Sequence, residues 1–317
     1  MIKILIQAIA ILVILCFSPI SFANDSAAGI AATGIYLKEE KNISIEKEDL
    51  YISENKIEVS YIFKNHSNND IITEIVFPIP DYKFDLSDMT VEPMYDDFIV
   101  EINGKRIKHK EEIRAFVNKI DHTILLENMG ISIKDFGKIA EFTRYNPKRD
   151  KGQIPELFFK KLSKVQQQLL IKNNLVINDN NFLWPNWKVS RKYYWTQTFP
   201  AKGTVTVRHS YRPYMGYALF SSKNEIPQNA CIDGKADLWL KKRPNISNYT
   251  YVDYILVTAN NWKKPIRSFR LVIESKDDGK HISTCYPKLT KKTSSRFEAS
   301  LTNFVPKQDI RIYFIEY

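Results

Sequence analysis

The sequence lacks the short motifs that mark the common enzyme classes. It contains no H-E-x-x-H, G-x-S-x-G or C-x-x-C pattern, no phosphate-binding P-loop and no dinucleotide-binding G-x-G-x-x-G. Its five histidines never stand four residues apart, as a pair of metal ligands on one helix would. We therefore expect no cofactor, no metal site and no catalytic residues that can be named. These absences favour a binding or interaction protein over an enzyme. An envelope hydrolase or glycan-processing enzyme, with a site assembled from distant residues, is the alternative.

A hydrophobic run long enough to cross a membrane is also absent. The apolar stretch 4–17 is shorter than the ~20 residues that a spanning helix needs, and Pro19 soon follows it. Lys3 precedes the stretch, and Ser21 and Ala23 fit the small-x-small rule of a cleavage site. We predict a signal peptide over residues 1–23, a periplasmic or secreted location, and no transmembrane segment after cleavage.

Cysteine is scarce and basic residues exceed acidic ones. Beyond the predicted leader only Cys231 and Cys285 remain, and in an oxidising compartment two cysteines are typical of one disulfide. The net charge is +10. Outside the cytoplasm this charge favours an envelope protein or a cell-wall or other anionic glycan as partner, and no nucleic acid. Alternatively the lysines only keep the chain soluble, since their clusters are short and scattered.

Alternating apolar residues dominate the chain and predict strands. Ile57, Val59, Tyr61 and Phe63 share one face of KIEVSYIFKN, and the Asn-rich turn 66–70 separates this segment from a second alternating one, which suggests a hairpin. FIVEINGKRIKH contains Asn-Gly, the preferred dipeptide of a two-residue hairpin turn. With 17 Tyr and 18 Phe against 10 Gly, the composition also favours strands.

The middle of the chain changes to a helical period. Ile113, Phe116, Val117 and Ile120 recur at helical spacing, and a second amphipathic segment follows Pro155. We predict a helical insert over about 110–177 within an N-terminal β-sandwich-like domain, residues 24–220. Polar turn-formers at 221–229 then precede a small C-terminal β-sandwich domain, residues 228–317. The predicted fold class is mainly β, or α+β by content, with two sandwich-like domains.

Several phrases in fixed order resemble a known family. They are NDSAAGIAATGIYL, VSYIFKN followed by IVFPIPD, YYWTQTFPAKGTVTVRHSYRP, YVDYILVTANNWKKPI and NFVPKQDIRIYF. Together they resemble the exported bacterial family described as domain of unknown function 4424, over essentially the whole chain after the leader. The resemblance implies export and names no activity.

A more distant likeness is to the vault/inter-α-trypsin domain, a β-sandwich interaction module. It rests on the order strand, F-x-N, strand ending F-P-x-P, hairpin, helices and a P-x-x-G-x-V-x-V strand. The likeness implies a sandwich for residues about 30–220. The companion domain of that family carries a D-x-S-x-S metal site, and the segment from Asp85 to Met89 departs from this pattern at its last position. The metal chemistry is therefore not carried over.

The aromatic segment FLWPNWKVSRKYYW is the strongest candidate for a binding surface. Rings interleaved with cations suit sugar stacking or an anionic partner. Alternatively the rings anchor the insert onto the sandwich core. The candidate residues are Trp184, Trp187, Arg191, Tyr193, Tyr194 and Trp195.

Overall fold

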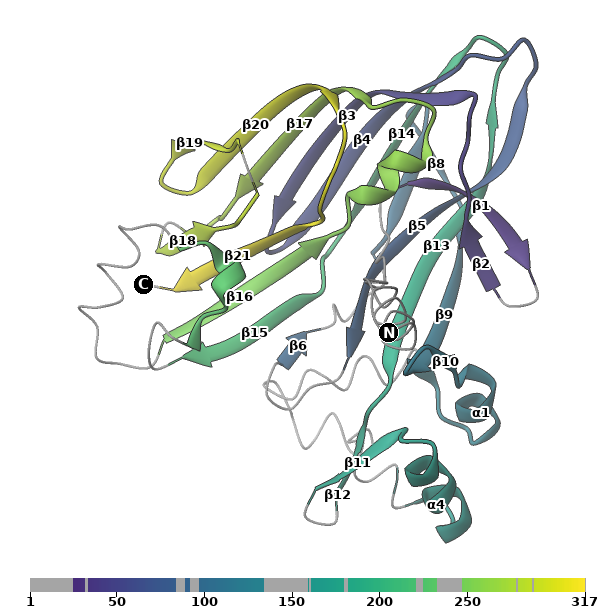
Figure 1. The fold of residues 1–317 in the computed structure, drawn as a ribbon, viewed down its shortest axis with the longest axis vertical. Helices are drawn as coiled ribbons and strands as arrows, with labels where there is room; N and C mark the ends of the chain where they lie inside the picture. The colour runs from purple at the N-terminus through teal and green to yellow at the C-terminus, as the bar shows by residue number, and fades with distance from the viewer. Residues whose placement is uncertain are drawn as a thin grey trace, which may run out of the picture.

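The computed structural model describes residues 25–31, 34–83, 89–91, 97–133, 159, 161–179, 182–220, 225–232, 247–277, 279–286 and 288–316. The predicted signal peptide, residues 1–23, lies outside them. Within the described residues the chain is mainly β with its sheets in layers, as predicted (Figure 1). No helix in these segments has the length and apolar character needed to cross a membrane.

Eight strands form the large sheet, in which all neighbours are antiparallel except β17 and β3. The order is β19 (Thr290–Thr293), β20 (Arg296–Phe304), β17 (Ile266–Glu274), β3 (Ile43–Ser53), β4 (Lys56–Asn65), β14 (Thr204–Tyr211), β7 (Ile99–Ile102) and β8 (Lys105–Ile107). The alternation predicted for β4 is confirmed, since Ile57, Val59, Tyr61 and Phe63 are all buried. The hairpin of β7 and β8 is also confirmed, with positive φ angles of 50° at Asn103 and 78° at Gly104.

Two smaller antiparallel sheets complete the fold. The six-stranded sheet has the order β10 (Ile120–Asp121), β9 (Lys110–Val117), β13 (Lys188–Phe199), β5 (Ile71–Lys83), β1 (Ser26–Ala31) and β2 (Gly34–Leu37). The five-stranded sheet has the order β18 (Lys280–Ser283), β21 (Ile310–Glu316), β16 (Ser247–Tyr254), β15 (Met215–Phe220) and β6 (Met89–Val91). The hairpin of β11 (Val176–Asp179) with β12 (Phe182–Pro185) is separate.

One hydrophobic core joins all three sheets. Phe63 of the large sheet meets Phe199 of the six-stranded sheet edge-on, with ring centroids 5.7 Å apart. Tyr61 of the large sheet shares a hydrogen bond of 3.1 Å between hydroxyls with Tyr254 of the five-stranded sheet. The large sheet thus packs against both smaller sheets, which is a sandwich-like arrangement. Residues of all three sheets belong to one cluster of buried apolar side chains, so the sheets share a core.

Strands from both sides of the predicted division, between residues 220 and 228, share two of the sheets. Strands β17, β19 and β20 come from the C-terminal segment but join the large sheet, where β17 pairs in parallel with β3. Conversely, β6 and β15 come from the N-terminal segment and join the five-stranded sheet. Local composition could not reveal this, because parallel pairing of β3 with β17 joins distant parts of the chain.

Two local predictions are wrong. The segment with Ile113 and Val117 at helical spacing is strand β9, which pairs with β13 over residues 110–116. The strands on either side of the turn 66–70 do not form a hairpin, because β4 lies in the large sheet and β5 in the six-stranded sheet. In both cases tertiary pairing decided what the local pattern left ambiguous.

The described helices of the predicted insert are α1 (Thr123–Asn128) and α4 (Lys164–Lys172). Helix α4 begins at Ser163, whose hydroxyl accepts from the Gln166 backbone while the Gln166 side chain accepts from the Ser163 backbone. This capping box satisfies two N-terminal donors. Leu126 of α1 and Leu170 of α4 are buried in a second apolar cluster, which also contains residues of β9 and β13. The short 3₁₀ helices are η4 (Gln228–Ala230) and η5 (Val257–Asn261).

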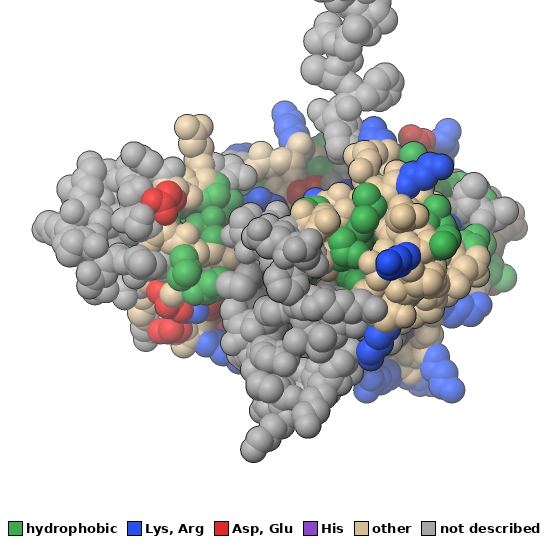
Figure 2. All heavy atoms as spheres, turned by 90° about the horizontal axis from the view of Figure 1, so that it is seen from below, with side chains coloured by type: hydrophobic (Ala, Val, Ile, Leu, Met, Phe, Trp, Pro, Cys, Tyr) green, Lys and Arg blue, Asp and Glu red, His purple; other side chains and the backbone are tan. Residues whose placement is uncertain are grey.

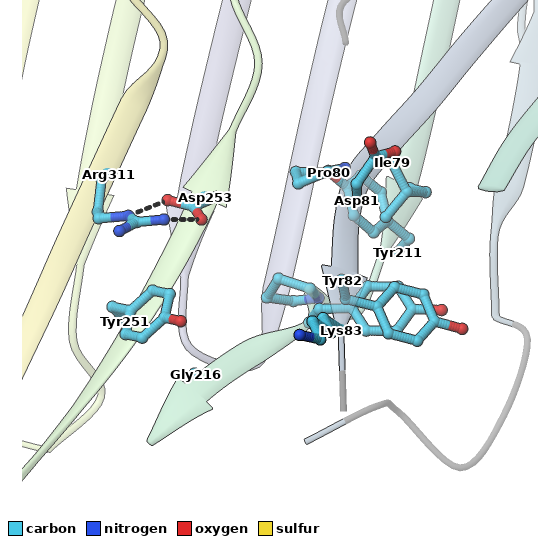
Figure 3. Close-up of a pocket in the computed structure, with 12 residues that line it drawn as sticks. Ile79, Pro80, Asp81, Tyr82, Lys83, Tyr211, Gly216, Tyr251, Asp253 and Arg311 are labelled. Carbon is cyan, nitrogen blue, oxygen red and sulfur yellow. Dashed lines mark hydrogen bonds and ion pairs between the residues drawn. The ribbon is translucent and has the colours of Figure 1, made fainter. Parts of the chain in front are cut away.

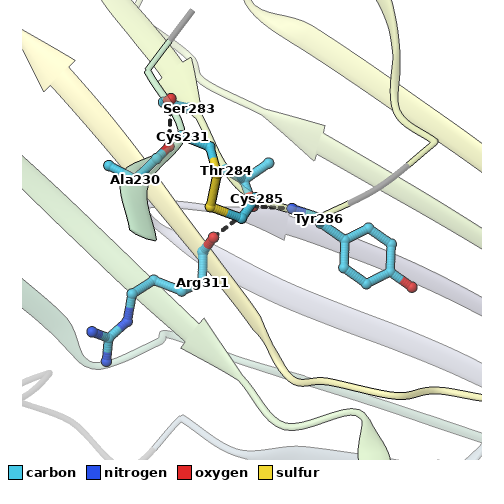
Figure 4. Close-up of a disulfide and its surroundings, with 7 residues drawn as sticks. All are labelled: Ala230, Cys231, Ser283, Thr284, Cys285, Tyr286 and Arg311. Carbon is cyan, nitrogen blue, oxygen red and sulfur yellow. Dashed lines mark hydrogen bonds between the residues drawn. A yellow bond between two sulfur atoms is a disulfide. The ribbon is translucent and has the colours of Figure 1, made fainter. Parts of the chain in front are cut away.

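The predicted disulfide between Cys231 and Cys285 is present (Figure 4). It closes a span of 54 residues and joins the end of η4 to the segment after β18. Beside it, the Thr284 hydroxyl donates to the Arg311 carbonyl at 2.6 Å. This hydrogen bond links the residue before Cys285 to the backbone of β21.

Candidate functional site

The aromatic segment singled out in the sequence belongs mostly to the core. Four of its six candidate residues are at most 5% exposed: Trp187, Arg191, Tyr193 and Trp195. Trp184 and Tyr194 are half-buried. Trp187 lies edge-on to Phe159 in the second apolar cluster, which packs the helices against the sheet. This burial fits the packing alternative, and the six residues do not share one exposed surface.

Helix α4 exposes apolar side chains but shows no cavity of its own among the described residues. Val165 is 74% exposed and Ile171 46%. Seen from below, green apolar side chains on this side of the molecule lie beside blue Lys and Arg side chains (Figure 2). These positions line none of the cavities described below, so we look for the candidate site elsewhere.

A cleft opens where the end of β5 diverges from the five-stranded sheet (Figure 3). We call it the junction cleft, and its volume is about 170 Å³. All three sheets contribute to its lining, which consists of Ile79, Pro80, Asp81, Tyr82, Lys83, Tyr211, Pro213, Tyr214, Gly216, Tyr251, Asp253 and Arg311. Four tyrosines and four charged side chains thus meet in a small space. Such a combination of apolar rings and a few placed polar groups is typical of ligand pockets.

One wall of the cleft holds a fixed ion pair. Arg311 donates to both carboxylate oxygens of Asp253, at 2.5 and 2.6 Å, and its guanidinium lies 4.6 Å from the Tyr251 ring centroid. The hydrogen bond to Asp253 is the main cause of a raised Arg311 pKa, so the charge is permanent. Gly216 lies opposite Tyr251 in the pairing of β15 and β16, and a Cβ there would come within 1.9 Å of the ring. Glycine at 216 therefore lets the ring lie flat across the neighbouring strand.

The opposite wall is an aromatic platform. The rings of Tyr82 and Tyr214 stack with centroids 4.4 Å apart and an interplanar angle of 20°. Behind them the buried Arg191 forms an ion pair with Glu111 and donates to the Tyr214 hydroxyl at 2.7 Å. Arg191 is thus a positioning residue for the platform, although the sequence suggested direct binding.

Tyr211 of the large sheet lines the cleft, and its hydroxyl is buried. The residue is 6% exposed, and its hydroxyl has no hydrogen-bond partner within the described part of the chain. Burial raises the pKa of Tyr211, so the hydroxyl stays neutral and can both donate and accept. A buried polar group without a partner costs free energy, so this hydroxyl destabilises the folded state.

A second polar group lies sealed in the core. His209 Nε2 is 3.4 Å from Asp25 Oδ1, and both side chains are fully buried. Burial lowers the pKa of His209 to about 3, and burial together with Glu48 raises the pKa of Asp25. The imidazole is therefore neutral at neutral pH. Neither residue lines the junction cleft, so this pair is not available to a ligand there.

Metal binding has no support in the described segments, where no three His, Cys, Asp or Glu side chains gather around one point. The residues 85–88 of the D-x-S-x-S-like stretch lie outside the described residues.

Sequence reasoning missed the cleft residues Tyr82, Tyr251, Asp253 and Arg311. The only local signal was the alternation of aromatic and polar residues in YTYVDY. Because these side chains come from strands in different sheets, their convergence could not be read from spacing.

The fold and the cleft together define a mainly β protein with a sandwich-like core and a small aromatic, charged cleft. The family model described as "Domain of unknown function (DUF4424)" matches residues 23–313. The chain belongs to this family, as the resemblance in its sequence predicted. The likeness to the vault/inter-α-trypsin domain stays a prediction.

A comparison with solved structures finds the crystal structure of a candidate nutrient-binding protein from Legionella pneumophila. It is 13% identical, has a TM-score of 0.42, and the match covers 93% of this chain and 72% of that one. A similarity at this level supports no conclusion about the ligand of this chain. Among curated proteins none matches the sequence.

Proposed function

We propose that this protein is an exported binding protein of the cell envelope and that the junction cleft holds one ring of a glycan. Export is supported by the leader-like segment 1–23 and by the disulfide, which persists in oxidising compartments. The partner class follows from the cleft, whose lining includes none of the six candidate residues of the aromatic segment.

The observation that carries the proposal is the convergence of Tyr251, the Arg311–Asp253 pair and the Tyr82–Tyr214 platform on one cleft. Aromatic rings offer flat apolar surface to the C–H face of a sugar ring. A fixed guanidinium and carboxylate offer donors and acceptors to its hydroxyl groups. At about 170 Å³ the cleft is smaller than the ~300–1,000 Å³ of typical drug-sized pockets, which suits a single ring of a longer chain.

Charge pairing in the cleft favours binding over hydrolysis. Asp81 is held by Lys188 at 2.8 Å, and Asp253 is held by Arg311. A glycosidase needs one carboxylic acid with a raised pKa and one free carboxylate on either side of the scissile bond. Both carboxylates of the cleft are already committed to cations, so the cleft lacks that pair.

The test is isothermal titration of the purified protein with an N-acetylglucosamine hexamer, a cellohexaose and a hexagalacturonate. Arg311→Lys keeps the charge but cannot reproduce the bidentate contact, so we expect about tenfold weaker binding. Arg296→Lys is the matched control, because Arg296 also forms ion pairs, with Glu274 and Glu298, but lies outside the lining of the cleft.

Binding of at least one hexamer that Arg311→Lys weakens and Arg296→Lys leaves within twofold supports the proposal. Absence of binding to all three hexamers would overturn it. Equal affinity of wild type and Arg311→Lys would overturn it as well, because the ring would then lie elsewhere.

A further inference from the structure

A second hollow adjoins the junction cleft on the other side of the end of β5. We call it the basic groove, and its volume is about 790 Å³. Asp81 and Lys83 line both hollows, so one extended ligand can reach from one into the other. The lining consists of Asp81, Lys83, Phe116, Val117, Asn118, Lys119, Asn174, Asn186, Lys188 and Ser190.

The basic groove gathers lysine side chains whose positive charges repel one another. Its three lysines and one aspartate leave a net charge of +2 at pH 7. Lys83 and Lys188 are direct cross-strand partners of β5 and β13, and like charges opposite each other destabilise a sheet. Asp81 compensates Lys188 at 2.8 Å. Within the described part of the chain, the ammonium groups of Lys83 and Lys119 have no ion pair or hydrogen bond.

Lys119, which lines the same groove, has an unfavourable backbone conformation. It follows Asn118 in the turn between β9 and β10, and both residues have positive φ, 49° and 70°. Asparagine and glycine adopt this conformation readily, whereas lysine does so rarely. The local turn therefore gives no reason for a lysine at position 119, while its place in the lining of the groove does.

A neighbouring hollow shows the opposite pattern. It is lined by Glu111, Glu112 and Glu127 with Arg114, and the Glu112 carboxylate is already engaged by the Ile35 backbone N–H, Arg114 and Lys192. In the view from below, Asp and Glu side chains gather towards the five-stranded sheet, and Lys and Arg side chains predominate on the α4 side (Figure 2). Uncompensated positive charge next to the junction cleft thus characterises the basic groove.

We infer that the basic groove binds the acidic group of a glycan whose neighbouring ring occupies the junction cleft. This inference rests on the proposed function. The Lys83 and Lys119 ammonium groups would pair with a carboxylate or sulfate, and Asn174 and Asn186 would offer amide groups to the adjoining hydroxyls. Binding of an anion would also relieve the repulsion between Lys83 and Lys188. The ligand class is therefore an acidic oligosaccharide.

The test compares a Lys83→Gln/Lys119→Gln double variant with a Lys105→Gln/Lys288→Gln control. The control removes the same charge at two exposed lysines outside the groove, and Lys288 shares the positive φ of Lys119, at 65°. Each protein is titrated at 50 and 200 mM NaCl with a hexagalacturonate, a sulfated heparin hexasaccharide and a neutral N-acetylglucosamine hexamer.

We expect the groove variant to bind the acidic hexamers about tenfold more weakly at 50 mM NaCl, with a smaller loss at 200 mM because salt screens the contact. Its affinity for the neutral hexamer should fall by less than its affinity for the acidic hexamers, because Lys83 also lines the junction cleft whereas Lys119 lines the groove alone. The control should stay within twofold of wild type throughout. A preference for one acidic hexamer identifies the anion as carboxylate or sulfate.

An equal loss in both double variants would overturn the inference, because it would show general charge attraction. So would wild-type protein that binds neutral and acidic hexamers alike, and this result leaves the proposed glycan function in place. Wild-type protein that binds no hexamer overturns the proposed function and the inference together.

Discussion

Replacing Tyr211, which lines the junction cleft, with phenylalanine removes a single buried hydroxyl and leaves the ring in the core. The ring packs against Phe77 and Phe98, with centroids 5.4 and 6.0 Å away, and these contacts persist in the variant. The hydroxyl has no partner among the described residues, and an unsatisfied buried hydroxyl costs about 1–3 kcal/mol. We therefore expect Tyr211→Phe to be as stable as wild type or about 1 kcal/mol more stable.

Tyr61→Phe is the matched control in the same core. Its hydroxyl lies 3.1 Å from that of Tyr254, and both residues are fully buried. Removing it breaks this bond and deprives Tyr254 of a partner, so we expect a loss of about 1–3 kcal/mol. The same chemical change at two sites of similar burial should thus have opposite effects on the free energy of unfolding.

Urea unfolding followed by tryptophan fluorescence measures both variants, with the slope m compared to confirm that only stability has changed. If Tyr211→Phe destabilises the protein as much as Tyr61→Phe does, its hydroxyl has a partner in solution. The argument that this buried hydroxyl lacks a hydrogen bond would then fail.

Three further predictions concern the frame around the site. Replacing Cys231 and Cys285 together by serine should lower the free energy of unfolding by about 4 kcal/mol, from the loop-entropy estimate for a span of 54 residues. Unfolding of the wild-type protein with and without reductant should give the same difference. Gly216→Ala should cost about 1–3 kcal/mol and displace the Tyr251 ring, because its Cβ would lie 1.9 Å from that ring; near-ultraviolet circular dichroism would show the change. The His209 pKa is lower in the folded state, so its contribution to stability is full above pH ~6.5 and falls by about 1.4 kcal/mol per pH unit towards about pH 3. His209→Gln should therefore flatten acid unfolding between pH 6 and 4, and an unchanged slope would contradict the assignment.

The alternation of one strand and the residues of one hairpin turn could be predicted from the sequence. The alternation of β4 and the Asn103-Gly104 turn both correspond to the structure, because each depends on residues a few positions apart. The helical spacing around Ile113 led to a wrong prediction of a helix. The segment is a strand beside β13, and it buries the alternate residues Ala115 and Val117. Short apolar segments are compatible with both the helical and the strand period. Here pairing with the edge of β13 favoured the strand.

The sequence by itself determined the mainly β class, the family, and the two cysteines that form the disulfide. Each of these depends on residue types, on short-range periodicity or on the order of motifs along the chain. Only the tertiary structure decided that the two halves share their sheets, that the aromatic segment lies in the core, and that Tyr211, Tyr251 and Arg311 line one cleft. The physical reason is that strand pairing joins residues more than 200 positions apart, as in β3 and β17, and no local pattern records which strands will become neighbours.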